Sequence, residues 1–188
     1  MMSTRDLVLS ALFAAIIVAL GILPPITLGF IPVPITAQSL GVMMAGVVLG
    51  ARRGAIAVLI VLVLVAIGLP VLSGGRGGLA AFAAPTTGFL IGWLFAASVT
   101  GYVAERLVRA EQSGLVQTVG FFLASAIGGI IVLYAFGIAY LVVAAGVGLQ
   151  QAFVGSMAFV PGDVIKAFVA ALAGRAVMVG YPLLPARA

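Results

Sequence analysis

The chain consists mainly of long apolar runs that are interrupted by short segments rich in glycine, proline or arginine. In the run at residues 55–69, AIAVLIVLVLVAIGL, apolar and polar positions do not alternate as they do in a strand of a membrane β-barrel. A helix of about 20 residues crosses the hydrocarbon layer of a bilayer. The pattern therefore predicts an all-α membrane protein.

Six of these runs are candidates for transmembrane helices, which together predict a compact six-helix bundle. No linker, charge block or low-complexity segment separates them, so we expect residues 1–188 to form a single domain. The predicted helices are residues 7–23, 36–49, 55–69, 85–108, 115–143 and 161–180.

The composition agrees with this pattern, because 64% of the 188 residues are apolar and only 7% are charged. Such a composition excludes a water-soluble globular protein. The first run could also be a signal peptide. However, Asp6 lies in what would be its basic region, the apolar part is long, and no clear small-x-small cleavage site follows, so we expect an uncleaved first helix.

Basic residues predict the orientation of the bundle. With six helices, placing both termini in the cytoplasm puts seven of the nine Lys and Arg residues at cytoplasmic helix ends, as the positive-inside rule requires. The net charge of +5 therefore reflects membrane topology, and no clustered basic stripe indicates nucleic-acid binding. The seven residues are Arg5, Arg52, Arg53, Arg106, Arg109, Arg175 and Arg187.

Three charged residues remain on the external side: Arg76, Asp163 and Lys166. Asp163 and Lys166 are three residues apart and so lie on one helix face. A charge at bilayer depth costs about 2.5 to 3.5 kcal/mol on insertion scales, so such a pair usually has a function. We expect the loop at 70–84 and the outer end of the last helix to line an outward-facing pocket. An ion pair that only joins two helices is the alternative.

Two external connections have unusual compositions. Pro24, Pro25, Pro32 and Pro34 fix φ and remove amide donors, so the connection ILPPITLGFIPVPITAQS (22–39) should form a stiff, extended cap, or simply a rigid connector. The second connection, SGGRGG at 73–78, surrounds Arg76 with glycines that allow close approach to a ligand, although a flexible turn has the same composition.

Other residue types narrow the chemistry and the packing. Cysteine and histidine are absent, which excludes thiol catalysis and the commonest zinc and copper sites. Small residues spaced four apart predict close helix contacts. These pairs are Ala11 and Ala15, Gly46 and Gly50, and Gly88 and Gly92.

Four motifs together closely resemble the BioY family, the biotin-specific S components of energy-coupling factor (ECF) transporters. They are IPVPITAQSLGVMMAGVVLG (31–50), GLPVLSGGRGG (68–78), APTTGFLIGW (84–93) and FVPGDVIKAFVAAL (159–172). The resemblance implies a prokaryotic inner-membrane protein that binds biotin from outside as substrate, with no cofactor. It also implies two kinds of partner, a transmembrane coupling subunit and cytoplasmic ATPases. The chain itself has no ATP-binding motif and is not expected to be an enzyme. Whether it forms a homo-oligomer stays open.

The resemblance also implies roles for individual residues. Asp163 and Lys166 become substrate contacts, Asp163 for the ureido N–H donors and Lys166 for either the ureido carbonyl or the valerate acid. Arg76 becomes the partner of the ligand carboxylate at the mouth of the pocket. Some family members supply an arginine after a PTGGY-like stretch, but here Leu90 follows PTTGF. The remaining assignments are Gln38 and Thr86 as secondary hydrogen-bonding residues, Ala11 and Ala15 as the surface for the coupling subunit, and Trp93, Phe82, Phe89, Tyr134 and Phe159 as candidates for the apolar wall.

Three other functions stay open at this point. An S component for another small vitamin would share the same architecture. An ion-coupled secondary transporter would typically show acidic residues in discontinuous helices of two repeats, and only Asp163 qualifies. An intramembrane enzyme would need a catalytic set such as paired carboxylates, and Asp163 is the only acidic residue away from the predicted cytoplasmic ends.

Overall fold

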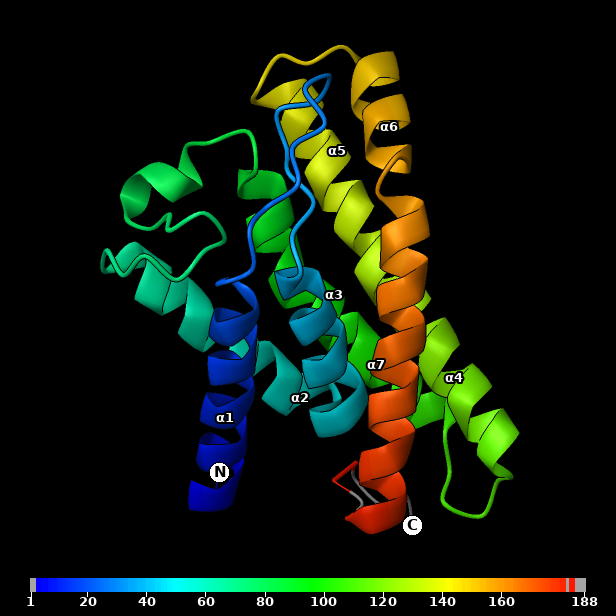
Figure 1. The fold of residues 1–188 in the computed structure, drawn as a ribbon. Helices are drawn as coiled ribbons and strands as arrows, with labels where there is room; N and C mark the ends of the chain where they lie inside the picture. The colour runs from blue at the N-terminus through cyan, green and yellow to red at the C-terminus, as the bar shows by residue number, and fades with distance from the viewer. Residues whose placement is uncertain (1–2, 182, 185–188) are drawn as a thin grey trace.

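The computed structural model describes residues 3–181, 183 and 184 and shows a helical bundle (Figure 1). Within these residues, extended pairing is limited to two isolated bridges. Arg187, one of the seven residues used for the topology prediction, lies outside the described residues. The helices are α1 (Thr4–Leu20), α2 (Gln38–Ala66), α3 (Thr87–Leu107), α4 (Gly114–Ala126), α5 (Leu133–Val143), α6 (Leu149–Met157) and α7 (Val160–Gly180), with a 3₁₀ turn η1 (Leu79–Phe82) and a π-helical segment η2 (Ile127–Val132).

Helix α2 is a hairpin rather than one rod. Gly50 has φ 83° and ψ 178°, a conformation that only glycine adopts readily, and it separates residues 38–49 from residues 51–66. The two halves pack closely, since a Cβ on Gly54 would lie 2.9 Å from the carbonyl oxygen of Ala45. Glu105 on α3 accepts a hydrogen bond of 2.9 Å from the Ala51 amide at the start of the second half. The predicted separation of helices 36–49 and 55–69 is thereby confirmed.

The helices correspond to the six predicted helices, although fewer qualify as full membrane spans. By length and composition, α2, α3 and the continuous helix Gly114–Val143 can each cross a membrane, and α6 with α7 forms a fourth candidate that is bent by 48°. The break at Gly50 divides α2 into two helical halves, and α1, with 17 residues, is at the short end of the range for a span. The bounds agree with the six predicted helices, whereas α6 was not predicted.

Glycines allow the helices to approach one another, as the small-residue spacing predicted. A Cβ on Gly46 would lie 2.7 Å from the Thr100 side chain, and one on Gly88 would lie 2.3 Å from the Cβ of Tyr140. Gly92 is similarly close to Leu133. Gly50 has a different role, since its positive φ makes the turn between the two halves of α2.

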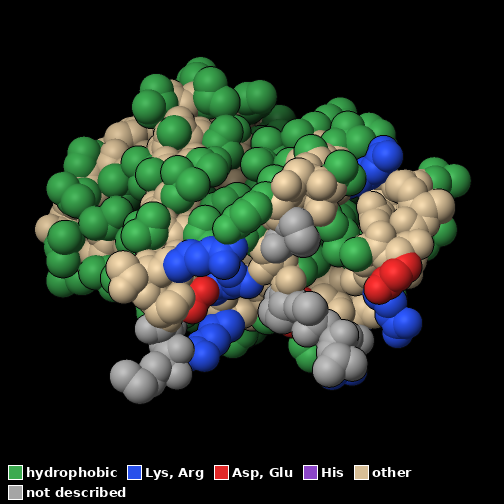
Figure 2. Space-filling model, turned by 90° about the horizontal axis from the view of Figure 1, so that it is seen from below, with side chains coloured by type: hydrophobic (Ala, Val, Ile, Leu, Met, Phe, Trp, Pro, Cys, Tyr) green, Lys and Arg blue, Asp and Glu red, His purple; other side chains and the backbone are tan. Residues whose placement is uncertain are grey.

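Both described ends of the chain lie at the same end of the bundle (Figure 1). Seen from this end, the surface shows several Lys and Arg side chains together with a few Asp and Glu side chains (Figure 2). Arg53 lies 3.6 Å from Asp6 and also donates a hydrogen bond to the Leu183 carbonyl. Arg53 follows the Gly50 turn by three residues, so this turn is at the same end, and the residues that begin α2, α3 and α7 lie toward the opposite end.

Candidate functional site

A cavity of about 650 Å³, including space open to the surroundings, lies among residues at the starts of α2, α3 and α7, which are toward the end of the bundle opposite the described ends of the chain. Its walls come from the cap, the start of α2, the loop before η1, the start of α3, α5 and the start of α7. All five residues predicted to bind substrate line it: Gln38, Arg76, Thr86, Asp163 and Lys166.

Asp163 and Lys166 form a buried ion pair on α7. Pro161 is in the first turn, where its missing amide hydrogen costs no helix hydrogen bond, and Asp163 follows where the helix dipole favours a carboxylate. Lys166 Nζ lies 2.7 Å from Asp163 Oδ1. The ammonium also donates to the Thr36 carbonyl at 2.9 Å and to the Ser39 hydroxyl at 3.0 Å. Each of its three hydrogens therefore has an acceptor in the protein.

Tyr134 completes the surroundings of the carboxylate. Its hydroxyl donates a hydrogen bond of 2.6 Å to Asp163 Oδ2. The ring packs edge-on against Phe89 and Phe159, with centroid separations of 6.3 and 6.4 Å. The sequence predicted Tyr134 only as part of the apolar wall. Its hydrogen bond depends on the rotation of α5 about its axis, which apolar periodicity does not define.

Arg76 contributes a cation at the mouth of the cavity. It is exposed, and its guanidinium makes only long hydrogen bonds, 3.4 Å to the Ser73 carbonyl and 3.3 Å to the Thr86 hydroxyl. No carboxylate among the described residues lies within ion-pair distance of it. A tight turn presents this side chain, because Gly74 and Gly75 have φ values of 79° and 70°.

Gln38 lies on the cavity wall but is only 1% exposed. Its amide nitrogen donates to the carbonyls of Ile17 and Val71, and its oxygen accepts from the Ser73 amide. Both amide hydrogens are thus used within the protein. Thr86, the residue just before α3, lines the cavity, and its hydroxyl accepts a hydrogen bond from Arg76.

The proline-rich segment forms the predicted non-helical cap. Ile26 and Ile35 exchange backbone hydrogen bonds of 3.0 and 2.8 Å, and residues 33–36 line the cavity. Helix α6 supports the other side of the cap, since Gln151 donates to the Phe30 carbonyl at 3.1 Å and a Cβ on Gly155 would meet Ile31 at 2.8 Å. The missed helix α6 thus packs against the cap.

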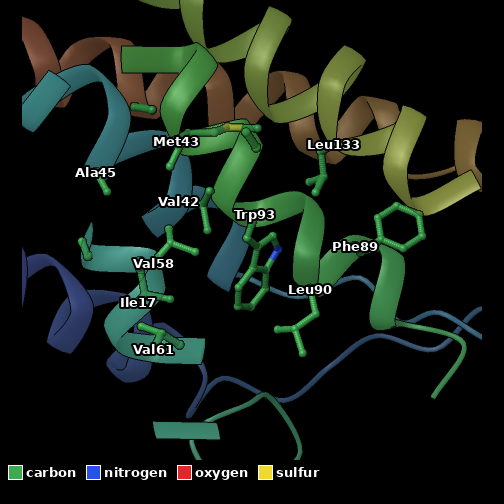
Figure 3. Close-up of a cluster of buried hydrophobic side chains, with 14 of the residues drawn as sticks. Ile17, Val42, Met43, Ala45, Val58, Val61, Phe89, Leu90, Trp93 and Leu133 are labelled. Atoms are coloured by element: carbon green, nitrogen blue, oxygen red, sulfur yellow. The ribbon is translucent and has the colours of Figure 1, made fainter. Parts of the chain in front are cut away.

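The apolar wall of the cavity is continuous with the core of the bundle. Phe89, Leu90 and Trp93 project from α3, beside the Val42, Met43 and Leu133 side chains (Figure 3). Of the five predicted wall aromatics, Trp93, Phe89, Tyr134 and Phe159 line the cavity. Phe82 does not; it is half-buried in η1 and packs against the core instead.

Ala11 and Ala15 do not line this cavity but lie on an exposed face of α1. Leu7, Val8 and Leu12 are exposed as well, whereas Phe13, Ala14 and Ile17 are buried in the bundle. The outward face of α1 is therefore apolar and has two small residues one turn apart.

Known proteins of similar sequence and structure are biotin transporters. The sequence model of the BioY family matches residues 1–182. The biotin transporter BioY of Rhizobium etli is 83% identical over the full length of both chains, and that of Rhodobacter capsulatus is 53% identical, covering 92% of this chain and 93% of the relative. A crystal structure of the S-component for biotin from an ECF-type ABC transporter has a TM-score of 0.87 at 36% identity, covering 95% of each chain. The chain belongs to the BioY family.

Proposed function

We propose that this protein is the biotin-binding and uptake subunit of an ECF-type transporter and captures biotin at the cavity. The observation that carries the proposal is the arrangement of charge. The Asp163–Lys166 pair is neutral as a unit, and Arg76 adds a cation with no carboxylate partner among the described residues. The side chains of the cavity therefore carry one surplus positive charge, which matches a ligand with one carboxylate.

Biotin fits the remaining groups. Asp163 accepts one hydrogen bond on each carboxylate oxygen from the protein, which leaves further lone pairs for the ureido N–H donors. Lys166 can bond the ureido carbonyl by exchanging its bond to Thr36 or Ser39. Arg76 binds the valerate carboxylate at the mouth, with Thr86 beside it. The aromatic wall takes up the thiophane ring and the alkyl chain.

The positive-inside rule supports an external position for the cavity. Arg5, Arg52, Arg106 and Arg175 flank the end of the bundle that holds both termini, so that end is cytoplasmic and the cavity faces outward. For a prokaryotic transporter of this type, the membrane is the inner membrane. The names of the relatives and the likeness to the biotin S-component support this location and substrate.

Energy for uptake comes from partners in this proposal. The sequence has no phosphate-binding G-x-x-x-x-G-K-[ST] motif, so a transmembrane coupling subunit and cytoplasmic ATPases would supply ATP-driven transport. The exposed face of α1 around Ala11 and Ala15 suits close docking of a helix from the coupling subunit, since small residues let helix backbones approach.

Ligand binding by the purified protein in detergent tests the substrate. We expect tight binding of biotin, and no competition from thiamine or riboflavin. Tight binding of another vitamin in place of biotin would contradict the proposed substrate but leave the class of protein, an S component, unchanged.

Uptake into vesicles tests the mechanism: we expect transport only with the ATPase module present. Uptake without ATPases that stops when the proton gradient is collapsed would instead indicate a secondary transporter.

A further inference from the structure

The side-chain amide of Gln38 joins three segments that meet beside the cavity. Nε2 donates to the carbonyl oxygens of Ile17 at 3.1 Å and Val71 at 3.0 Å, and Oε1 accepts from the Ser73 amide at 2.8 Å. Ile17 belongs to α1, Gln38 begins α2, and Val71 and Ser73 belong to the loop that carries Arg76. We call these four residues the Gln38 bridge.

The Gln38 bridge leads directly to Arg76. The Ser73 carbonyl accepts from Arg76 Nε, and Leu72 and Arg76 exchange backbone hydrogen bonds of 3.0 and 3.2 Å. Between them, Gly74 and Gly75 make the turn and have no side chains that could hold it in place. The turn is therefore anchored by the Gln38 bridge and by the Ser73 hydroxyl, which donates to the Leu23 carbonyl at 2.9 Å.

We infer that Gln38 is a positioning residue for Arg76, which it holds through Ser73 in the orientation that binds the ligand carboxylate. This inference rests on the proposed function and replaces the predicted direct contact between Gln38 and the ligand. Both hydrogens of the Gln38 amide are already donated to backbone carbonyls, so the amide has no N–H left for a carboxylate.

A substitution at Gly21 is a second, independent way to disturb the Gln38 bridge. A Cβ there would lie 2.7 Å from the Val71 carbonyl oxygen and 2.8 Å from Gln38 Nε2. The backbone of Gly21 has φ −70° and ψ −17°, which alanine adopts without strain. The Gly21→Ala substitution therefore crowds the bridge without removing any of its hydrogen-bonding groups.

The test compares two ligands, biotin and biotin methyl ester, which lacks the negative charge. The Gln38→Met substitution keeps the length of the side chain and removes the three hydrogen bonds. We expect the affinity for biotin to fall about tenfold, as for the loss of one hydrogen bond to a charged group, and the affinity for the ester to stay within about threefold. In an Arg76→Ala background, Gln38→Met should have little further effect, because the residue that it positions is already gone.

Gln117 provides the matched control. It is also a buried glutamine, and its Nε2 donates to the carbonyls of Arg109 and Ala110, remote from the cavity. The Gln117→Met substitution should lower thermal stability in the same way but leave the affinities for both ligands unchanged.

Three results would overturn the inference: equal losses for biotin and the ester, losses that add to those of Arg76→Ala, or unchanged biotin affinity in Gln38→Met. If Gln38→Met does not fold, Gly21→Ala decides, and it must show the same selective loss for biotin. Failure of the proposed function has a different signature, because the unsubstituted protein would then bind no biotin at all.

Discussion

The Tyr134 hydroxyl donates a 2.6 Å hydrogen bond to Asp163, so the buried carboxylate is held from α5 as well as by Lys166 on its own helix. A hydrogen bond to a charged group contributes about 1.5 to 3 kcal/mol. The bond fixes the direction in which the remaining lone pairs of Asp163 point into the cavity.

The Tyr134→Phe substitution should therefore weaken biotin binding by about 10- to 150-fold, measured by titration calorimetry in detergent. The phenyl ring keeps the edge-on contacts with Phe89 and Phe159, so the wall itself is preserved. Tyr140→Phe, on the same helix but outside the cavity, is the control and should bind as the unsubstituted protein does. Equal affinities in both variants would show that the hydroxyl does not orient the carboxylate.

The Asp163→Asn substitution should abolish tight binding and also lower the thermal stability, because it leaves the Lys166 ammonium buried beside a neutral amide. Removing one partner of a buried ion pair typically costs about 3 to 5 kcal/mol. The double substitution Asp163→Asn with Lys166→Met removes the stranded charge, so thermal unfolding should recover while binding does not. A folded Asp163→Asn protein with unchanged affinity would reduce the pair to a helix-joining ion bridge.

Trp93 is the only tryptophan in the chain, and it lines the cavity. Biotin binding should therefore change the intrinsic tryptophan fluorescence, with a saturation point that reports the number of sites per chain. The Trp93→Phe protein should lose this signal. If calorimetry detects binding but biotin does not change the fluorescence of the unsubstituted protein, the ligand binds away from α3.

Gly50→Ala tests the hairpin in α2. An alanine at φ 83° and ψ 178° is strained by about 1 to 3 kcal/mol, so the yield of folded protein and its melting temperature should fall. Gly180→Ala is the control, since no atom within 4 Å would meet its Cβ and alanine favours the helix. If both variants are equally stable, the break at Gly50 is not needed for the fold.

Apolar run length predicted the six helices, because lipid allows few alternatives to a continuous helix. Helix α6 escaped prediction because Leu149–Met157 is short and includes Gln150 and Gln151, so it does not resemble a span. The charged residues of the site were predicted because charges are rare here. The hydrogen bond of Tyr134 was not predicted, since it depends on the π-helical segment η2 just before Tyr134. The Gln38 bridge was not predicted either, because its partners are backbone groups that any sequence offers.

The exposed position of Arg76 has a kinetic consequence. An uncompensated cation at the entrance attracts anions from solution before any contact is made, and dissolved salt screens this attraction over about 8 Å at physiological ionic strength. The association rate of biotin should thus decline as sodium chloride is added, whereas its dissociation rate should change little.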